Sequence, residues 1–246
     1  MKLIRIDKKR KFLISKLHSV HTDKGTFPEE EISQNYGQTI QSNKGIKAHI
    51  LYPTLEDIIK KLDRKTQILF PKELAMLPFL MDLRIGSTVV ECGTGSGSAS
   101  IFFSNMIGPT GKLLSFERRF SFINIAKQNL KKFSQFNNYH LINADIKEKF
   151  PIQDEIADAV FIDVPEPFAM VEAVYKVLKP GKSVVFLVPT TTQIIELLET
   201  LKTKKFVATR ILEILHREWN PNPKALRPTD RMIAHTAFLV QTFKII

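Results

Sequence analysis

From residue 66 to the end of the chain, short apolar segments alternate with helix-length amphipathic segments. This alternation limits the fold more than any other feature. Strands separated by helix-length crossovers form a parallel sheet that helices cover on both faces. The pattern therefore predicts an α/β fold with a Rossmann-like, doubly wound, seven-stranded sheet. The predicted strands are TVVEC (88–92), GKLLSFE (111–117), YHLIN (139–143), ADAVFID (157–163), SVVFLV (183–188), FVATRILEIL (206–215) and AHTAFLVQT (234–242).

Five segments between these strands have apolar residues at helical spacing. The predicted helices are PKELAMLPFLMDL (71–83), SASIFFSNMI (98–107), RFSFINIAKQNLKKF (119–133), PFAMVEAVYKVLKPGK (167–182) and TQIIELLETLKTK (192–204). Gly181 is expected just past the end of the fourth helix. The last two strands lack a helical crossover between them, so one of them should run antiparallel.

The first part of the chain has a different pattern. Short apolar pieces in residues 1–55 are broken by turn sequences such as DKGTF and SNKG, which predicts a small β-rich, barrel-like domain. Residues 56–65 are expected to form a linker helix, because Thr54 is a good N-cap and acids follow it. Residues 66–246 then form the larger domain.

A glycine-rich turn, VVECGTGSGSAS (89–100), follows the first strand of the larger domain. It lacks the Gly-Lys-Ser/Thr of a phosphate-binding loop, and Ser98 stands where a dinucleotide fingerprint needs glycine. Glu91 precedes the turn, and its charge would oppose a pyrophosphate. S-adenosylmethionine carries a sulfonium, an ammonium and an uncharged ribose, so it suits an acid at this position. The alternative is a tight strand–helix turn with no ligand.

Acids recur where the next strands end. Glu117, Asp145 and Asp163 follow the second, third and fourth strands, so with Glu91 four acids fall at the edge where such sheets bind ligands. Glu117 can accept hydrogen bonds from ribose hydroxyls, and Asp145 from an adenine amino group. Each acid alone could instead cap a helix, as Asp145 in particular could.

The charge balance indicates a polyanionic partner. Lys and Arg number 36 and Asp and Glu 25, which gives a net charge of +11. Such a surplus favours nucleic-acid binding, although a solvated basic surface is the alternative. The candidate phosphate contacts are KKRKF (8–12), KTKK (202–205), Arg217, Lys224, Arg227 and Arg231.

Composition also bears on the classes of protein to exclude. Cys92 is the single cysteine, so a disulfide framework or a cysteine-based metal cluster is excluded. The six histidines lack metal-ligand spacing, and no metal is expected. No window resembles a membrane span and the N-terminus is too charged for a secretory signal, so we expect a cytoplasmic protein.

Several further stretches resemble one family, the tRNA (adenine-N1)-methyltransferases of the TrmI type. The stretches are HTDKGTF (21–27), GIKAHILYPTLEDIIKKLDRKTQILFPKE (45–73), ECGTGSGS (91–98), IDVPEP (162–167) and REWNPNPKALRPTDRMIAHTAFLV (217–240). The resemblance covers nearly the whole chain. It implies methyl transfer from S-adenosylmethionine to N1 of an adenosine in the T loop of tRNA, at position 58 and in some members also 57. It also implies a homotetramer.

The resemblance assigns roles position by position. Asp163 would be catalytic and would lie between the cofactor and the target base. The other residues implied to bind the cofactor are Gln67, Glu91, Gly93, Thr94, Gly95, Ser96, Gly97, Glu117 and Asp145, and those expected to bind the substrate are Phe70, Phe168, Arg227 and His235. Tyr36 is a further candidate for stacking on a base. Phe70 replaces a tyrosine that is usual in the family, which removes any role that needs the hydroxyl.

Two other functions stay open on the sequence. The glycine turn also resembles that of protein isoaspartyl or other class I methyltransferases, which do not need the TQILFPKE box or the basic balance. The second is a non-catalytic tRNA-binding paralogue. Such a protein should have lost the glycines of the turn or Asp163, and both are present in this sequence.

Overall fold

The computed structural model describes residues 1–8, 10–64, 69–146 and 149–246. The chain divides into two compact units, Met1–Leu62 and Asp63–Ile246. None of the helices in the described ranges is both long and apolar enough to cross a membrane.

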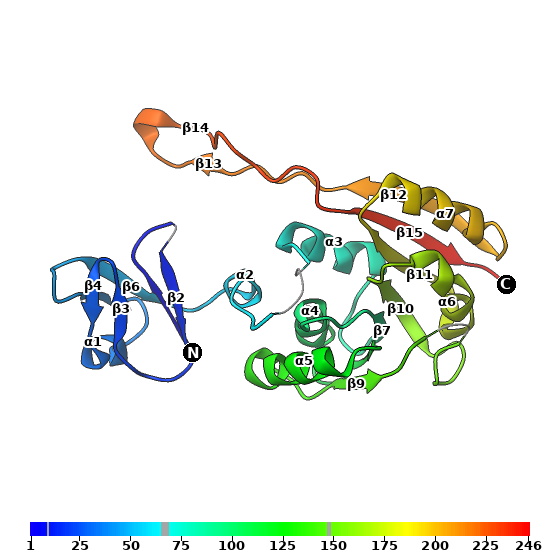
Figure 1. Cartoon of the computed structure of the whole chain (residues 1–246), viewed down its shortest axis with the longest axis horizontal. Coiled ribbons are helices and arrows are strands. Elements are labelled where there is room, and N and C mark those ends of the chain that lie inside the picture. Colours follow the sequence, from blue (N-terminus) through cyan, green and yellow to red (C-terminus); the bar gives the residue numbers. More distant parts are fainter. Residues whose placement is uncertain (9, 65–68, 147–148) are drawn as a thin grey trace. The chain divides into compact units, whose positions relative to one another are not determined.

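The first unit is built on a four-stranded antiparallel sheet (Figure 1). Its strands, in spatial order, are β2 (Lys11–Ile14), β1 (Lys2–Arg5), β6 (Lys47–Leu51) and β5 (Thr39–Gln41). A hairpin of β3 (Val20–Thr22) and β4 (Gly25–Phe27) and a short helix α1 (Glu29–Ser33) complete it. Alternate residues of the sheet, such as Ala48 and Ile50, join Phe27 of β4 and Ile32 of α1 in one apolar core.

Helix α2 (Leu55–Ile59) closes the first unit. Thr54 caps it as the sequence predicts: its hydroxyl accepts from the Asp57 N–H at 3.2 Å, and the Asp57 carboxylate accepts from the Thr54 N–H at 3.1 Å. The buried Asp57 also pairs with Lys11 of β2, so α2 is tied to the sheet. The described helix is shorter than the expected 56–65 segment, whose residue 65 lies outside the described ranges.

The second unit contains the predicted seven-stranded sheet (Figure 1). Its strands, in spatial order, are β12 (Phe206–Glu213), β15 (Phe238–Lys244), β11 (Leu178–Val188), β10 (Ala157–Ile162), β7 (Thr88–Cys92), β8 (Lys112–Glu117) and β9 (Tyr139–Asn143). The five strands from β11 to β9 run parallel, whereas β15 pairs antiparallel with both β11 and β12. The prediction of one antiparallel strand near the end is confirmed.

Helices cover both faces of this sheet, as the fold class requires. One layer holds α3 (Pro71–Met81), α4 (Ser98–Ile107) and α5 (Phe120–Phe133), and the other holds α6 (Val171–Val177) and α7 (Thr191–Leu201). Neighbouring strand residues point to opposite layers. Val90 belongs to the core beneath α6 and α7, whereas Phe161 contacts Phe103 of α4 with ring centroids 5.5 Å apart.

One helix is shorter than predicted. The segment 167–182 forms a 3-10 turn η1 (Pro167–Met170) and then α6, which ends at Val177. Residues from Leu178 onward, including Gly181, belong to β11. Pro180 has no N–H to continue a helix and its ring disfavours helical backbone before it, which accounts for the early end.

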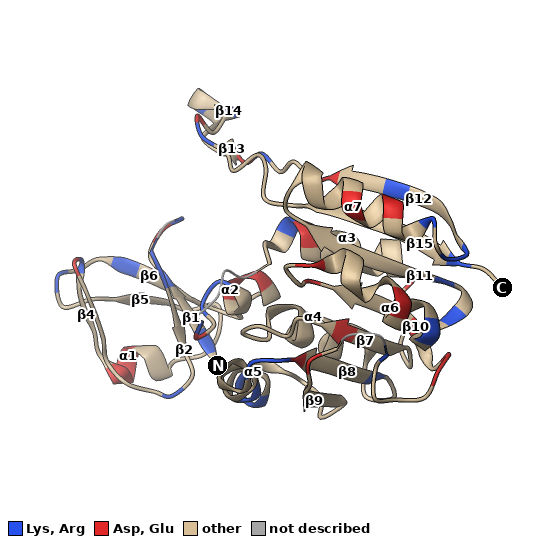
Figure 2. Ribbon diagram, turned by 45° about the vertical axis from the view of Figure 1, so that its right-hand side comes forward, with Lys and Arg blue, Asp and Glu red and all other residues tan. Residues whose placement is uncertain are grey.

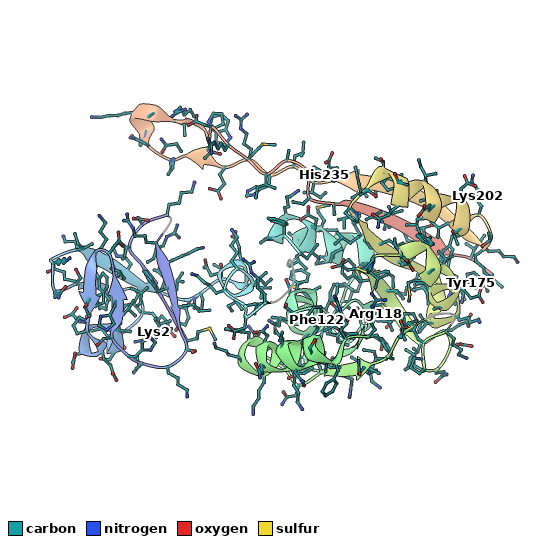
Figure 3. All side chains as sticks on the ribbon, in the orientation of Figure 1. Lys2, Arg118, Phe122, Tyr175, Lys202 and His235 are labelled. Carbon is teal, nitrogen blue, oxygen red and sulfur yellow. The ribbon has the colours of Figure 1, made fainter. Side chains whose placement is uncertain are left out.

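A long arm joins β12 to β15. It carries a small hairpin of β13 (Trp219–Asn220) and β14 (Arg227–Pro228) with a 3-10 turn η2 (Pro223–Ala225) at its tip. Residues 221–230, rich in proline, form the end of this hairpin, which extends away from the sheet (Figure 1). The arm also carries four of the basic residues predicted to contact phosphates, which are Arg217, Lys224, Arg227 and Arg231. Figure 2 marks Lys and Arg positions along the ribbon in blue. His235 lies where the arm meets the sheet (Figure 3).

Candidate functional site

The glycine turn is held against the end of a neighbouring strand. Gly93 follows β7 with φ +101°, and a Cβ placed on it would lie 1.9 Å from the carbonyl oxygen of Asp163. The Asp163 N–H donates to the Cys92 carbonyl at 2.9 Å. The turn therefore needs glycine at position 93 so that the chain after β10 can approach this closely.

The rest of the turn forms the start of α4. Gly97 is its N-cap, with φ +85°, and a Cβ there would meet Ala126 of α5 at 3.3 Å. The Thr94 hydroxyl lies 2.6 Å from that of Ser115, and the Ser96 carbonyl accepts from Asn129 at 2.8 Å. Three of the predicted cofactor residues, Thr94, Ser96 and Gly97, therefore stabilise the turn through contacts with β8 and α5.

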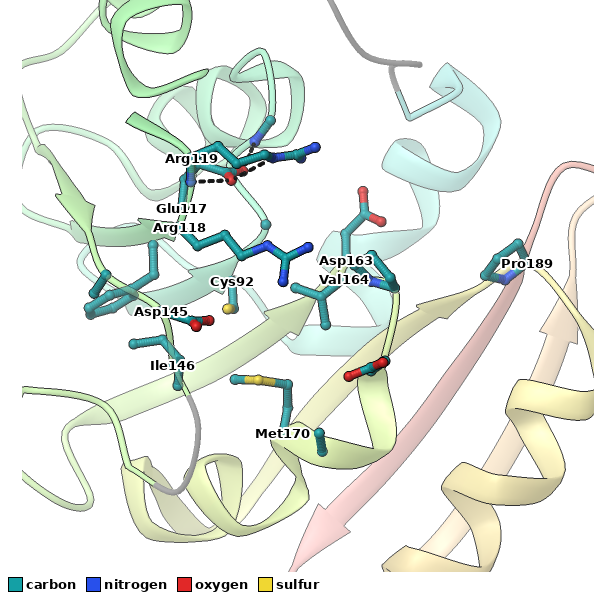
Figure 4. Close-up of a pocket in the computed structure, with 17 residues that line it drawn as sticks. Cys92, Glu117, Arg118, Arg119, Asp145, Ile146, Asp163, Val164, Met170 and Pro189 are labelled. Atoms are coloured by element: carbon teal, nitrogen blue, oxygen red, sulfur yellow. Dashed lines mark hydrogen bonds and ion pairs between the residues drawn. The ribbon is translucent and has the colours of Figure 1, made fainter. Parts of the chain in front are cut away.

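A cavity of about 410 Å³ opens beside the turn, at the carboxyl ends of β7, β8, β9 and β10 (Figure 4). A volume of this size is in the range of small-molecule sites. Five predicted residues line it, which are Gly93, Gly95, Glu117, Asp145 and Asp163. Acids from three strand ends thus converge on one cavity.

Glu117 is the most firmly held of these acids. One carboxylate oxygen accepts from the Gly95 N–H at 3.1 Å, and the other accepts from the Arg119 N–H at 2.9 Å and from Arg119 Nε at 3.2 Å. The side chain is only 4% exposed. These donors orient the carboxylate within the cavity (Figure 4).

Asp163 lines the cavity and is exposed there, with protein atoms packed close to it. This partial loss of water raises its pKa to about 6, and the charge of Glu117 adds to the effect. At neutral pH the group is mostly a carboxylate, but it is more basic than an ordinary aspartate. Asp145 also lines the cavity and is exposed.

Glu91 lies behind the cavity rather than among its described lining residues. It is fully buried, and one of its oxygens accepts from Ser100 at 2.5 Å and from Ser115 at 2.6 Å. Burial is the main cause that raises its pKa to about 8; the negative charges of Asp163 and Glu117 contribute to the rise, and the hydrogen bonds from Ser100 and Ser115 oppose it. Its other oxygen is buried without a partner in the described part of the chain. A direct contact between Glu91 and the cofactor stays a prediction.

The predicted substrate residues lie outside the described cavity lining. Phe70 is the half-buried N-cap of α3, Phe168 lies in η1, and Arg227 pairs with Asp230 on the arm at 2.5 Å. Tyr36 belongs to the first unit, where its ring stacks on Tyr52 with centroids 3.6 Å apart. Gln67 lies outside the described residues.

His235 contacts Pro189, a residue at the rim of the cavity. Its Nε2 lies 2.9 Å from the carbonyl oxygen of Pro189, which lines the cavity, and its Nδ1 lies 2.6 Å from a carboxylate oxygen of Glu213. The neighbouring Thr236 donates to the buried Glu73 of α3, which also pairs with Lys72 at 2.8 Å. The FPKE and HTAF stretches, far apart in sequence, therefore meet at one place.

Part of the basic surplus is paired within the chain. Lys202 pairs with Glu199 at 2.8 Å, Lys204 pairs with Glu172, and Arg10 pairs with Asp7 at 2.6 Å. Two of the predicted basic clusters therefore offer fewer free cations than their sequences indicate.

Sequence reasoning did not select several lining residues. Arg118, Glu166 and Pro189 line the cavity, each just after the carboxyl end of a strand or close to it. All three lie near strand ends, as Glu117 and Asp163 do, but only one acid at each strand end was predicted to bind a ligand. Figure 4 shows the Arg118 side chain between Glu117 and Asp145.

The donor set fits S-adenosylmethionine better than a phosphate ligand. Four acids line the cavity, Glu117, Asp145, Asp163 and Glu166, against two arginines, Arg118 and Arg119, of which Arg119 pairs with Glu117. The remaining negative charge would repel a phosphate. A cation beside an uncharged ribose would be attracted. Within the described residues, no group of three or more His, Cys, Asp or Glu is arranged to hold a metal ion.

Comparison with known proteins bears on both the fold and the site. The sequence model of a family described as the tRNA methyltransferase complex GCD14 subunit matches residues 47–241. TrmI from Methanocaldococcus jannaschii, named as a tRNA (adenine(57)-N(1)/adenine(58)-N(1))-methyltransferase, is 30% identical, with 97% of this chain and 93% of that protein covered. TrmI from Thermus thermophilus, named as a tRNA (adenine(58)-N(1))-methyltransferase, is also 30% identical, with 89% and 86% covered.

Two solved structures resemble the chain over its whole length. The tRNA (m1A58) methyltransferase TrmI from Aquifex aeolicus is 34% identical with a TM-score of 0.89, and 96% of that chain is covered. A protein from Thermotoga maritima, described as a SAM-dependent O-methyltransferase, is 32% identical with a TM-score of 0.93, and 92% of it is covered. Both likenesses include the first unit as well as the sheet domain.

Proposed function

The chain belongs to the family of the tRNA methyltransferase complex GCD14 subunit, and we propose that it transfers a methyl group from S-adenosylmethionine to N1 of an adenosine in the T loop of tRNA. The observation that carries the proposal is the convergence of Glu117, Asp145 and Asp163 on one cavity beside a glycine turn. The relatives named for this activity at 30% identity over most of both chains support the choice of substrate. Position 58 is the first candidate, with 57 as a second.

The cofactor would lie along the acid-lined rim. Glu117 would accept hydrogen bonds from the ribose hydroxyls, Asp145 would contact the adenine, and Gly93 and Gly95 would allow close approach of the backbone. Glu91, Thr94, Ser96 and Gly97 would keep the turn in shape, and Gln67 would lie near the methionine end. When bound, S-adenosylmethionine supplies an electrophilic methyl group on a positively charged sulfur.

Asp163 would act on the target base. Neutral adenine carries a lone pair on N1, so the enzyme needs no covalent nucleophile. Methylation places positive charge on the base, and a carboxylate near its N6 amino group would stabilise that charge and accept an N6 proton. A pKa near 6 keeps Asp163 ionised at neutral pH and basic enough for this role. Alignment of base and donor would supply most of the rate enhancement.

Other regions would hold the tRNA. We propose that Phe70 and Phe168 stack on exposed bases, and that Arg217, Lys224, Arg227 and Arg231 of the arm contact phosphates. Extraction of the target base from a folded T loop would cost a few kcal/mol. The proposal includes a homotetramer acting in the cytoplasm.

A different acceptor is the main alternative, because one similar structure is described as an O-methyltransferase. The test offers labelled S-adenosylmethionine with bulk tRNA, with a catechol and with an isoaspartyl peptide in parallel. We expect label in tRNA alone, and label in either of the other two acceptors would contradict the proposal.

A matched variant separates catalysis from binding. Asp163→Ala should keep tRNA affinity and lose methyl transfer, whereas a tRNA-binding paralogue would show no transfer in either protein. Unchanged turnover in the variant would remove Asp163 from the mechanism.

A further inference from the structure

His235 has an acceptor on each of its ring nitrogens. A carbonyl oxygen, that of Pro189, lies 2.9 Å from Nε2, and a carboxylate oxygen of Glu213 lies 2.6 Å from Nδ1. A carbonyl oxygen cannot donate a proton, and an ionised carboxylate can only accept one. A neutral imidazole carries a hydrogen on one nitrogen only, so its other nitrogen would face an oxygen lone pair. Both contacts are hydrogen bonds only when the ring is an imidazolium.

The two partners lie on different elements at the cavity edge of the sheet. Pro189 directly follows β11, and Glu213 is the last residue of β12. His235 itself lies at the end of the arm, shortly before β15. One ring thus joins the ends of two strands to the start of a third, where the arm leaves the sheet and returns to it.

Lys72 also contacts the base of the arm. Its ammonium donates to the carbonyls of Ile214 and Ala234, at 2.6 and 3.1 Å, and these residues begin and end the arm. The base of the arm is therefore held by two basic side chains, Lys72 and His235.

The contact between His235 and Pro189 lies at the end of the cavity opposite Asp145. Figure 4 shows Asp145 and Pro189 on opposite sides of the cavity, with Asp163 between them. If Asp145 contacts the cofactor's adenine and Asp163 the target base, as proposed above, Pro189 borders the space for the base.

We infer that His235 is a positioning residue that acts as an imidazolium, fixing the Pro189 carbonyl at the target-base end of the cavity and tying it to Glu213 at the base of the arm. The inference rests on the proposed function for its effect on turnover. Its protonation state rests on the two contacts alone.

The charges around the ring agree with this state. The Pro189 carbonyl and the Glu213 carboxylate raise the pKa of His235 above its ordinary value, whereas the nearby Lys72 ammonium lowers it. Phe238 of β15 lies against the ring with centroids 4.7 Å apart, and Glu73 of α3 lies beyond Thr236. Because the folded-state pKa is raised, the contact stabilises the fold at low pH and loses that effect as pH rises through this pKa.

The first test observes the ring directly in the full chain. The His235 signals in nitrogen-15 NMR, assigned by their loss in His235→Phe, should show protons on both nitrogens at pH 6.5. Glu213→Gln, an exposed change that leaves the fold intact, should lower the pKa of His235. A neutral ring at pH 6.5, or no effect of Glu213→Gln, would overturn the inference.

The second test measures its consequence. His235→Phe should lower turnover on tRNA by about tenfold, since small misplacements near a reacting centre carry costs of this order. The dissociation constant for S-adenosylmethionine, measured by calorimetry, should change by less than about twofold. The turnover of wild type, but not of the variant, should fall as pH rises through the pKa of His235.

The control is His140→Gln, which changes an exposed histidine on β9. It should leave both the turnover on tRNA and the pH dependence of that turnover unchanged. Matching pH profiles for wild type and His235→Phe would contradict the inference. If wild type does not methylate tRNA, the proposed function fails, and the NMR measurements still decide the protonation state of His235.

Discussion

Asp163 combines a position at the end of β10 with a pKa raised to about 6, and partial loss of water in the cavity is the main cause. A base must be unprotonated to act, so turnover should rise as pH increases through about 6, and it should fall again at the higher pH where His235 loses its second ring proton. Asp163→Asn should lower turnover about 10²- to 10⁴-fold and abolish this rise. Initial rates between pH 5 and 8, with tRNA and cofactor in excess, provide the measurement.

Asp163→Glu serves as the control, because it keeps a carboxylate and should retain a pH-dependent rise at reduced turnover. A profile in Asp163→Asn with the same midpoint as wild type would show that another group titrates.

For single residues, the sequence predicted the positions of the acids at strand ends better than the burial and contacts of their side chains. The end of a strand is visible in the sequence, so Glu117, Asp145 and Asp163 can be placed at one edge of the sheet from sequence alone. Burial of a single side chain is not visible there. Glu91 is fully buried and accepts hydrogen bonds from Ser100 and Ser115, which the spacing of the acids along the sequence does not reveal. Pro189 and Arg118 reach the cavity through side-chain and loop directions that no spacing rule encodes.

The elements follow their sequence patterns where local preference and packing agree. Helix α4 occupies the predicted residues 98–107, because the glycine turn starts it and Gly108 ends it. Where they disagree, packing or backbone chemistry decides the boundary. Pro180 ends α6 early, and β15 begins at Phe238 rather than at residue 234. Before this strand, the His235 ring contacts Pro189 and Glu213. The Thr236 hydroxyl donates to Glu73.

The glycine turn offers a test at the scale of an element. Gly93→Ala and Gly181→Ala both place a side chain at positive φ, which costs about 1–2 kcal/mol in each. Around Gly181 the added Cβ meets nothing within 4 Å, whereas at Gly93 it overlaps the Asp163 carbonyl. Gly93→Ala should therefore lose at least about 2 kcal/mol more stability than Gly181→Ala, since the two loops must separate. Urea unfolding of both variants measures the difference.

The same pair of variants bears on the cofactor site. Gly181→Ala should bind S-adenosylmethionine like wild type, and Gly93→Ala should bind it weakly or not at all. Equal stability and equal affinity in the two variants would show that the close approach of the turn to β10 is not needed.

Across the whole molecule, net charge should dominate tRNA affinity. The chain carries +11, and if about six phosphates are neutralised, affinity should fall about 10³-fold between 50 and 200 mM salt. Filter binding of unmodified tRNA across this range measures the slope. Arg217→Ala and Arg231→Ala on the arm should each make the slope shallower by about one, and Lys202→Ala, already paired with Glu199, should not. A slope near zero would exclude phosphate contacts as the main source of affinity.

The division into two units could be predicted from sequence only in outline. A change of pattern near residue 55 separated a β-rich segment from the α/β region, and the boundary between the compact units falls between residues 62 and 63. Helix α2 lies with the first unit because Asp57 pairs with Lys11 of β2, a contact between residues far apart in sequence.

The most direct test of the account is the identity of the modified nucleoside. Unmodified tRNA is incubated with the purified chain and S-adenosylmethionine, and the products are digested and analysed by mass spectrometry, with reverse transcription to locate the modification. We expect N1-methyladenosine in the T loop, at position 58 or at 57 and 58, and none with Asp163→Ala. Methyl groups on ribose, on another base or outside the T loop, or tRNA left unmethylated by a chain that binds the cofactor, would contradict the account.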